Sequence, residues 1–291
     1  MKLIQLLGSR NKSDFAIYLG HTIASMGNRV LIVDATNNSV YLYSFIQFEE
    51  KEVLYEFQDI EILVSTKSWK ELVGKLEKAN EKIEDFDCII VDTNDSSTIY
   101  NDWPKFHHVL YVSDNTRFTI SQDVEILNNY VDATGVTTLQ RVHFESAHKI
   151  PNDYLNLLLN NRLDFNFVYE PLEYDDQEHK LLNYMQHENT IPYNKLQKDY
   201  KKLLKSIVTE IYDMGYKDFD ASSKQSLMGM FFGRFKSKET SGKVKNHDSE
   251  INEENLEEQS QPRLVLNNVS KQKDDSTNDE VNKKTKEVVG G

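Results

Sequence analysis

Cysteine is almost absent from this sequence, because Cys88 is the one cysteine in 291 residues. A single thiol forms no disulfide within its own chain, and its position in the apolar run 87–91 predicts a buried strand and a reducing compartment. Long apolar runs are lacking as well. The apolar stretch before Gly8 spans only a few residues, too few for the core of a signal peptide or for a membrane span. Together these shortages predict a cytoplasmic protein.

Positive charge is also scarce, with 34 Lys and Arg against 47 Asp and Glu and a net charge of −13. A nucleic-acid-binding surface needs a basic stripe that displaces counterions, so we expect no nucleic-acid partner. The eight histidines are scattered, and His107 and His108 are neighbours that point apart on a strand, so no zinc spacing occurs. No Gly-x-Ser-x-Gly or Cys–His pattern indicates nucleophilic catalysis. We therefore predict no metal site and no catalytic residue.

Short apolar runs separated by helical patterns make up most of the chain. Such runs are typical of parallel strands buried on both faces, and their alternation with helices predicts an α/β fold with a mostly parallel, doubly wound sheet. Gly27 is expected to end the first helix. The expected strands are 2–7, 29–33, 60–64, 88–91, 109–112, 138–142 and 165–169, and the expected helices are 13–26, 69–84, 120–130, 154–160, 174–187 and 193–214.

The composition divides the chain into four parts. Residues 1–215 form the α/β domain, 216–226 are a polar linker, and 227–236 are an amphipathic segment. Residues 237–291 contain no aromatic side chain and are rich in Glu, Asp, Lys, Asn and Ser. Such a segment buries too little apolar area to offset its ordering entropy, so we predict a disordered acidic tail.

The beginning of the chain reads as strand, loop, helix and strand, the first unit of a nucleotide-binding domain. Lys12-Ser13 stands at the end of the loop, a helical stretch begins at Phe15, and the second strand, 30–34, ends in Asp34. This order is similar to the MinD/ParA family of deviant-Walker ATPases. Residues 86–92 resemble the Walker B strand of that family, and residues 109–123 resemble its next strand and helix. The likeness covers roughly residues 1–215 and implies a P-loop NTPase-like fold.

The phosphate-binding loop departs from the family in its glycines. Backbone N–H groups converge on phosphate only where glycines permit unusual φ angles and close approach. The motif G-x-x-x-x-G-K-[ST] needs glycines at Leu6 and Asn11, but the loop retains only Gly8. The second lysine of the family falls on Leu7 or Arg10, depending on where a gap is placed.

Two further departures lie outside that loop. The Asp-x-Asp of the family, whose second aspartate orients the attacking water, is here Asp34-Ala-Thr36, and the glycine-rich switch after Asp92 is replaced by residues 93–97. Because phosphoryl transfer depends on positioning and electrostatics, these losses predict a degenerate pseudo-ATPase that binds nucleotide weakly or not at all. The vestigial cofactor-binding residues are Gly8, Arg10, Asn11, Lys12, Ser13, Asp34 and Asp92.

Simpler interpretations of the same residues stay open. Lys12 is then a solvated cation at the helix start and Ser13 the N-cap of that helix. Asp34 and Asp92 either hold Mg²⁺ through water or cap the elements that follow their strands. The aromatic run 41–48 fits either an interface or a covered loop–helix element. Trp69 and Trp103 are expected to serve in packing.

The amphipathic segment is the second informative feature. At helical spacing its Leu, Met and Phe side chains share one broad side, and its cations lie beside them, as in a helix that lies in a membrane interface. A terminal helix docked on the domain would use the same residues. Gly229 and Gly233 weaken an isolated helix, so folding is expected to accompany binding. The predicted membrane- or partner-binding residues are Leu227, Met228, Met230, Phe231, Phe232, Arg234, Phe235 and Lys236.

Two functions are compatible with these features. The first is a non-catalytic membrane-associated adaptor that positions a cell-envelope assembly, such as pilus, secretion or division machinery. Its partners are then the inner face of the cytoplasmic membrane and a protein of the assembly, with no cofactor. Firm attachment by one short helix needs two copies, which favours a homodimer. The alternative is a divergent active ATPase that dimerises on ATP, uses ATP and Mg²⁺ and cycles on and off the membrane.

Overall fold

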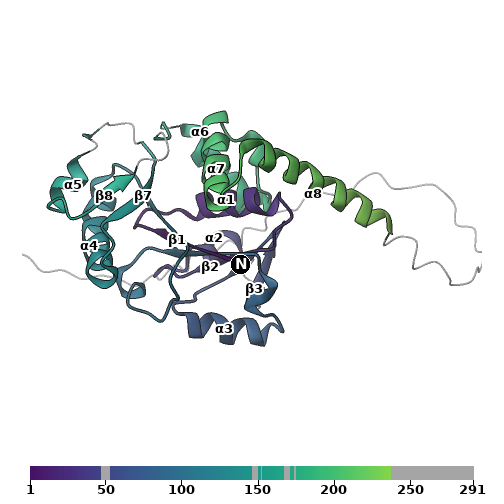
Figure 1. Cartoon of the computed structure of the whole chain (residues 1–291), viewed down its shortest axis with the longest axis horizontal. Coiled ribbons are helices and arrows are strands. Elements are labelled where there is room, and N and C mark those ends of the chain that lie inside the picture. The colour runs from purple at the N-terminus through teal and green to yellow at the C-terminus, as the bar shows by residue number, and fades with distance from the viewer. Residues whose placement is uncertain (47–52, 146–149, 152, 167–170, 174, 237–291) are drawn as a thin grey trace, which may run out of the picture. The chain divides into compact units, whose positions relative to one another are not determined.

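The computed structural model describes residues 1–46, 53–145, 150–151, 153–166, 171–173 and 175–236, with side chains described as far as Ser226. Within these residues the centre of the fold is an eight-stranded sheet in the order β3-β4-β2-β5-β1-β6-β7-β8 (Figure 1). Every neighbouring pair is parallel except β3 and β4, which are antiparallel. The strands are β1 (Lys2–Leu7), β2 (Val30–Asp34), β3 (Leu54–Phe57), β4 (Ile60–Leu63), β5 (Cys88–Thr93), β6 (His108–Ser113), β7 (Thr138–His143) and β8 (Asp164–Asn166).

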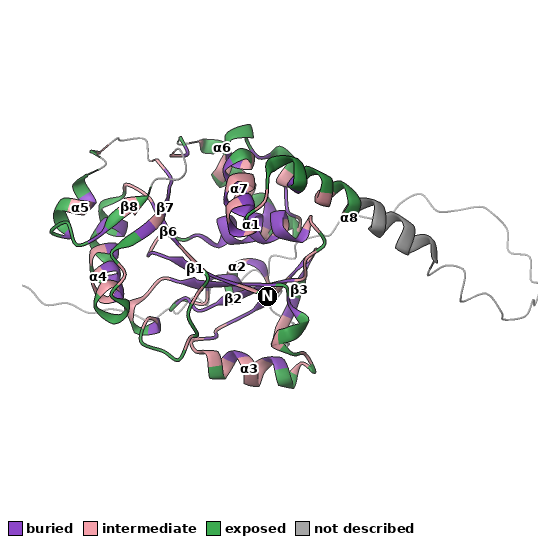
Figure 2. Cartoon of the chain, in the orientation of Figure 1, coloured by how far each residue is buried: buried purple, intermediate pink, exposed green. Residues whose placement is uncertain are grey.

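Helices cover both faces of this sheet, as the predicted α/β fold requires. One face packs against α1, α2, α6 and α7, and the other against α3, α4 and α5. Figure 2 shows the buried residues concentrated in the strands and on the sheet-facing sides of these helices. The helices are α1 (Ser13–Ala24), α2 (Val40–Phe45), α3 (Trp69–Lys78), α4 (Arg117–Thr134), α5 (Tyr154–Leu158), α6 (Asp176–Glu188), α7 (Lys198–Ile211) and α8 (Tyr216–Lys236), with short 3-10 turns η1 (Ile83–Asp85), η2 (Ser96–Thr98) and η3 (Tyr193–Lys195).

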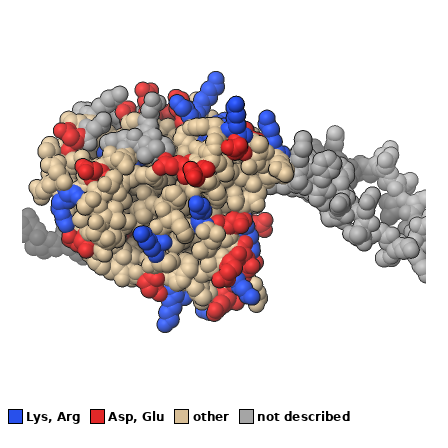
Figure 3. All heavy atoms as spheres, viewed as in Figure 1, with Lys and Arg blue, Asp and Glu red and all other residues tan. Residues whose placement is uncertain are grey.

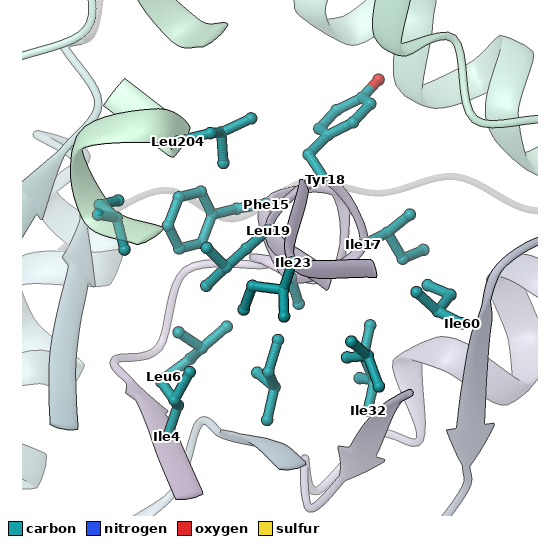
Figure 4. Packing of buried hydrophobic residues seen from close by; sticks show 14 of the residues in the cluster. Ile4, Leu6, Phe15, Ile17, Tyr18, Leu19, Ile23, Ile32, Ile60 and Leu204 are labelled. Carbon is teal, nitrogen blue, oxygen red and sulfur yellow. The ribbon is translucent and has the colours of Figure 1, made fainter. Parts of the chain in front are cut away.

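The central helix α1 shows why the chain folds around its first unit. Ile4 and Leu6 of β1 face α1, and Phe15, Leu19 and Ile23 of the helix point down onto them (Figure 4). All five side chains are fully buried. Burial of one such side chain contributes about 1.5–3 kcal/mol, so this contact alone fixes α1 on the sheet and thereby fixes the loop that precedes it.

Each predicted strand has a counterpart among the described residues, with ends shifted by a few residues, although 167–169 of the last one lie outside the described part; β3 and α2 were not predicted. The edge strand β3 alternates buried and exposed residues, with Glu56 exposed, and therefore lacks the apolar run of a central strand. The helix α2 has only six residues. Gly27 makes the turn after α1 with φ of +90°, but the helix itself ends earlier, at Ala24.

The C-terminal part of the described chain is helical where a linker was expected. Residues 216–226 form the first half of α8, which begins against α7: Lys205 pairs with Asp220, and Phe219 is buried. The backbone of α8 continues through residues 227–236, but the side chains of the predicted membrane-binding residues lie outside the described part, as does the predicted tail 237–291. Among the described helices, none is both long and apolar enough to span a bilayer.

Candidate functional site

The loop between β1 and α1 meets the ends of β2 and β5 at one edge of the sheet. β5 lies between β1 and β2, and its register aligns Asp92 with Asp34 on one side and with Leu6 on the other. Carboxyl ends of parallel strands share an edge, and Asp34, Asp92 and Lys12 of the loop lie together at that edge. Both carboxylates are buried, with Asp34 0% and Asp92 1% exposed.

Lys12 lies inside the protein rather than in solvent. Its side chain is 1% exposed, and its ammonium nitrogen lies 2.7 Å from Asp92 Oδ1. The same nitrogen donates to the carbonyl of Gly8 at 2.6 Å and to that of Thr93 at 3.0 Å. Two hydrogen bonds to backbone carbonyls and one ion pair with a buried carboxylate thus hold the ammonium within the protein. The interpretation of Lys12 as a solvated cation is therefore wrong.

Asn11 supplies the cap at the start of α1. Its Oδ1 accepts the backbone N–H of Ser13 at 3.1 Å and the Ser13 hydroxyl at 2.9 Å. Ser13 is the first residue of the helix and is buried, so its predicted role as N-cap is wrong. The side-chain oxygen of Asn11 thus accepts hydrogen bonds at the helix N-terminus, a position that favours anions.

Gly8 is required by the neighbouring strand. Its φ is +129°, and a Cβ added to it would lie 2.5 Å from the carbonyl oxygen of Val112 in β6. No side chain fits at that distance. The one glycine left in the loop therefore has a packing role, which the sequence interpretation of the loop did not identify.

Tyr41 completes the site and was not among the predicted residues. Its hydroxyl donates to Asp92 Oδ2 at 2.8 Å, and its backbone N–H donates to Asp34 Oδ2 at 3.2 Å. The ring is 0% exposed, so at this position the aromatic run 41–48 is a covered element. Residues 47 and 48 of the run lie outside the described residues. The only signal in the sequence is a tyrosine at the start of a short helical stretch after Asp34.

Thr36 and Lys67 hold the loop that follows β2. Asp34 Oδ1 accepts the backbone N–H of Thr36 at 3.0 Å and also its hydroxyl. Lys67, which sequence reasoning missed, donates from Nζ to the carbonyl of Ala35 at 3.2 Å and to that of Thr36. Burial, and to a lesser extent the charge of Asp92, raises the pKa of Asp34, while the bond from Thr36 opposes that rise. The residue that replaces the family's second aspartate thus hydrogen-bonds the first one.

Ser9 turns the other side of the loop toward α4. Its backbone N–H donates to Asp123 Oδ1 at 2.7 Å, and the Tyr111 hydroxyl donates to Asp123 Oδ2 at 2.6 Å. Asp123 is 0% exposed, and its burial raises its pKa. The helical aspartate of the family resemblance therefore binds the loop itself.

Arg10 lies apart from Lys12 and the two strand-end carboxylates, over a different set of partners. Its guanidinium carbon is 3.7 Å from the centre of the Phe144 ring, a cation–π contact. Asp114 and Asp14 lie at 3.9 Å and 4.0 Å from its nitrogens. Of the predicted cofactor-binding residues, Lys12, Asp34 and Asp92 are linked through Tyr41 and Gly8, whereas Arg10 is not part of that network.

Glu178 of α6 faces the start of α1, and its titration gives a testable pH dependence. Burial, and next the charge of Asp14, raises the pKa of Glu178 from 4.5 to about 7. A carboxyl whose folded-state pKa is raised adds stability below its unfolded pKa and loses that contribution as pH rises through about 7. We expect Glu178→Gln to gain stability relative to the wild type between pH 5 and pH 8, as urea unfolding at a series of pH values would measure. A difference that stays constant over this range would contradict the expected titration.

The titration of His143 also changes the stability with pH, so the stability of Glu178→Gln has to be compared with that of the wild type at each pH. Burial, followed by the charge of Arg141, lowers the pKa of His143 to about 4, so its own contribution to stability falls as the pH drops below 6.5. This slope has the opposite sign to that of Glu178. Because Glu178→Gln leaves His143 in place, subtracting the two curves isolates the glutamate.

Comparisons with known proteins give matches among solved structures. No protein-family model and no curated protein sequence matches the chain. A plasmid partition protein from Borrelia burgdorferi bound to AMPPNP has 17% identity and a TM-score of 0.48, with 72% of this chain and 98% of that chain covered. A ParA family ATPase from Chlorobium tepidum has 9% identity and a TM-score of 0.48, with coverage of 70% and 98%.

A third solved structure of the same kind contains MinD. The MinC:MinD cell division complex of Aquifex aeolicus has 12% identity and a TM-score of 0.43, with 70% of this chain and 96% of that chain covered. The structural neighbours of this chain are thus ParA- and MinD-type proteins.

Proposed function

We propose that this chain is a pseudo-ATPase of the MinD/ParA type that attaches to the inner face of the cytoplasmic membrane and positions a cell-envelope assembly. The observation that carries the proposal is the series of contacts that joins Lys12 to the two strand-end carboxylates. Lys12 binds Asp92, Asp92 binds Tyr41, and Tyr41 binds Asp34. Lys12, Asp34 and Asp92 are the side chains that an ATPase of this fold would turn toward nucleotide and Mg²⁺.

ATP and Mg²⁺ do not fit the site in this arrangement. Phosphate binding would require Lys12 to leave two carbonyl acceptors and its ion pair with Asp92, and Ser13 to leave Asn11. Removing a partner from a buried ion pair costs about 3–5 kcal/mol, which nucleotide contacts would first have to offset. The loop also lacks the glycines that would supply the backbone donors.

Metal binding at the strand ends meets a similar obstacle. Both oxygens of Asp34 accept protein donors, and the two oxygens of Asp92 face Lys12 and Tyr41. Magnesium retains several waters and needs free carboxylate oxygens. Within the described residues no group of three or more His, Cys, Asp or Glu side chains is placed to hold a metal ion.

The membrane part of the proposal depends on α8. Its backbone is helical through residues 227–236, the form that an interfacial segment needs. The sequence places five Leu, Met and Phe residues within Leu227–Phe232 and three cations within Arg234–Lys238. A single helix of this length binds reversibly, so a homodimer would strengthen attachment. On the face shown in Figure 3, acidic and basic side chains are interspersed, which supports a partner other than nucleic acid.

The alternative, an active ATPase that dimerises on ATP, has one observation in its favour. Lys12, Asp34 and Asp92 do meet at the carboxyl edge of the sheet, where nucleotides bind in open α/β folds. Under that alternative the bonds around Lys12 describe a resting state that nucleotide opens, and membrane attachment would depend on ATP.

Sedimentation with anionic liposomes separates the two functions. The adaptor is expected to sediment equally with no nucleotide and with ATP and Mg²⁺. The double variant Phe231→Glu/Phe232→Glu is expected to lower the membrane partition coefficient more than about 10-fold, because two large apolar side chains are lost from the lipid. The control carries Leu264→Glu and Val265→Glu, which add the same charges to another apolar stretch, and should sediment like the wild type.

Other outcomes of this experiment are equally decisive. Sedimentation that requires ATP would reject the adaptor in favour of the cycling ATPase. Equal sedimentation of the Phe231/Phe232 variant and the wild type would reject residues 227–236 as the membrane-binding segment.

A further inference from the structure

The first half of α8 packs against two other helices of the domain. Beside α7, Phe219 is buried, and the Lys205 ammonium lies 5.3 Å from the centre of its ring while it pairs with Asp220 at 2.5 Å. At the end of α1, the hydroxyl of Ser223 lies 3.4 Å from that of Ser25. Because α8 touches the domain at both places, it is held in one rotational setting about its own axis.

The contacts of this half of α8 follow one stripe along the helix. Its buried and half-buried positions recur at the spacing of a single helical face, and they are Phe219, Ser222, Ser223 and Ser226. Every other position from 216 to 225 is exposed. At the far end of the stripe, a Cβ added to Gly27 would lie 3.5 Å from the Ser226 hydroxyl oxygen. These four residues, here called the docked stripe, define the side of α8 that faces the domain.

The helix continues into 227–236, so the docked stripe sets the phase of that segment as well. Successive residues of an α-helix are turned by about 100°. Counted from the middle of the docked stripe, the positions that fall about 130–170° away, on the opposite side of α8, are Met228, Phe231, Phe232 and Phe235. Leu227, Arg234 and Lys236 fall about 70–90° away, on the flanks, and Met230 falls on the docked side. The phase thus assigns the aromatic positions to the side opposite the domain.

The same outer side is exposed and basic in the first half of α8. Lys217, Ala221 and Lys224 fall on it, about 150–170° from the docked stripe, and all three are exposed. Asp218 and Asp220 fall on the flanks. A line of lysines that continues into aromatic positions suits an anionic lipid surface, because the cations meet the headgroups and the rings enter the acyl boundary.

We propose that α8 is one rigid helix that binds on two sides at once: its docked stripe binds the domain, and the opposite side of 217–235 binds an anionic lipid bilayer. Attachment then fixes the orientation of the domain on the membrane, because no flexible linker separates the domain from the binding segment. This inference rests on the membrane attachment in the proposed function and adds the surface that faces lipid.

Alanines inserted between Ser226 and Leu227 test this coupling, because they change the phase and leave both halves of α8 intact. Two alanines turn 227–236 by about 200° relative to the domain, whereas seven turn it by about 700°, which restores the phase to within about 20°. Alanine has the highest helix propensity, so both insertions favour a continuous helix. The seven-alanine variant is therefore the matched control for the two-alanine variant.

Sedimentation of the full-length chain with liposomes of phosphatidylglycerol and phosphatidylcholine in equal parts measures the effect. The two-alanine variant is expected to bind about 10- to 100-fold more weakly than the wild type, because its aromatic side reaches lipid only if Phe219 leaves its buried place. The seven-alanine variant is expected to bind like the wild type. Circular dichroism verifies that both variants are folded.

The possible outcomes separate this inference from the proposed function. Equal binding of the two-alanine variant and the wild type would overturn the inference alone, because the segment would then be attached through a flexible joint. Equal loss in both insertion variants would also overturn it, since length rather than phase would matter. A wild type that does not sediment, or a Phe231→Glu/Phe232→Glu variant that sediments like the wild type, would reject the proposed membrane attachment and this inference with it.

Discussion

Replacement of Lys12 by alanine is expected to destabilise the fold by about 3–5 kcal/mol, the cost of removing one partner from a buried ion pair. The ammonium is enclosed with Asp92 at 2.7 Å and holds the carbonyls of Gly8 and Thr93. The substitution leaves the Asp92 carboxylate buried, with the Tyr41 hydroxyl as the one side-chain donor to it among the described residues. In an ordinary phosphate loop the lysine faces solvent or ligand, and its loss affects nucleotide binding first. Urea unfolding of the purified chain measures the difference.

A second lysine provides the control for this prediction. Lys205 pairs with Asp220, whose side chain is 56% exposed, so Lys205→Ala is expected to cost no more than about 1 kcal/mol. The double variant with Lys12→Ala and Asp92→Asn should recover part of the loss, because it removes the unpaired charge. If Lys12→Ala costs no more than Lys205→Ala, the buried position of Lys12 is incorrect.

Gly8→Ala is expected to destabilise the fold by about 2–5 kcal/mol, through overpacking and a φ that an alanine rarely adopts. The added Cβ would lie 2.5 Å from the carbonyl oxygen of Val112, a backbone atom that moves only if β6 moves with it. Thermal unfolding is a direct measurement. Since the prediction rests on packing, the loss should be the same with and without ATP in the solution.

Gly74 is the matched glycine for this experiment. It lies inside α3, and a Cβ added there meets nothing within 4 Å. Gly74→Ala should therefore stabilise the protein by about 1 kcal/mol through helix propensity. A Gly8→Ala variant as stable as the wild type would return Gly8 to the role of a phosphate-binding glycine.

The central strands could be predicted from the sequence because their burial requires a continuous run of apolar residues, which a short stretch of sequence shows. The run Lys2–Leu7 was predicted with its observed ends, since a strand buried on both faces has to be apolar throughout. The edge strand β3 has one solvent-exposed face, on which Glu56 lies, so its sequence contains no continuous apolar run. The polar composition of residues 216–226 predicts a linker, yet they form a helix that begins against α7 through Phe219. Polar composition indicates exposure, and it does not by itself exclude a helix.

The sequence indicates which residues lie at the candidate site, but it does not indicate the hydrogen bonds and ion pairs that they make. The order of Lys12, Asp34 and Asp92 follows from the topology of a parallel sheet, which brings strand ends together. The bond between Tyr41 and Asp92 joins residues 51 positions apart and depends on how α2 is placed over the sheet. Sequence spacing carries no information about such a contact. For the same reason the burial of Lys12 was missed, since a lysine side chain reaches either solvent or protein from the same backbone position.

We propose that contacts within the protein occupy the residues that would bind phosphate. The most direct test is a titration of the wild-type chain with a fluorescent ATP analogue, with and without Mg²⁺. We predict no saturable binding up to millimolar nucleotide, and the same flat titration for Lys12→Ala, because Lys12 and Ser13 are held by the protein itself. Saturable, Mg²⁺-dependent binding of the wild type that is lost in a folded Lys12→Ala variant would contradict this account and identify the chain as a divergent ATPase.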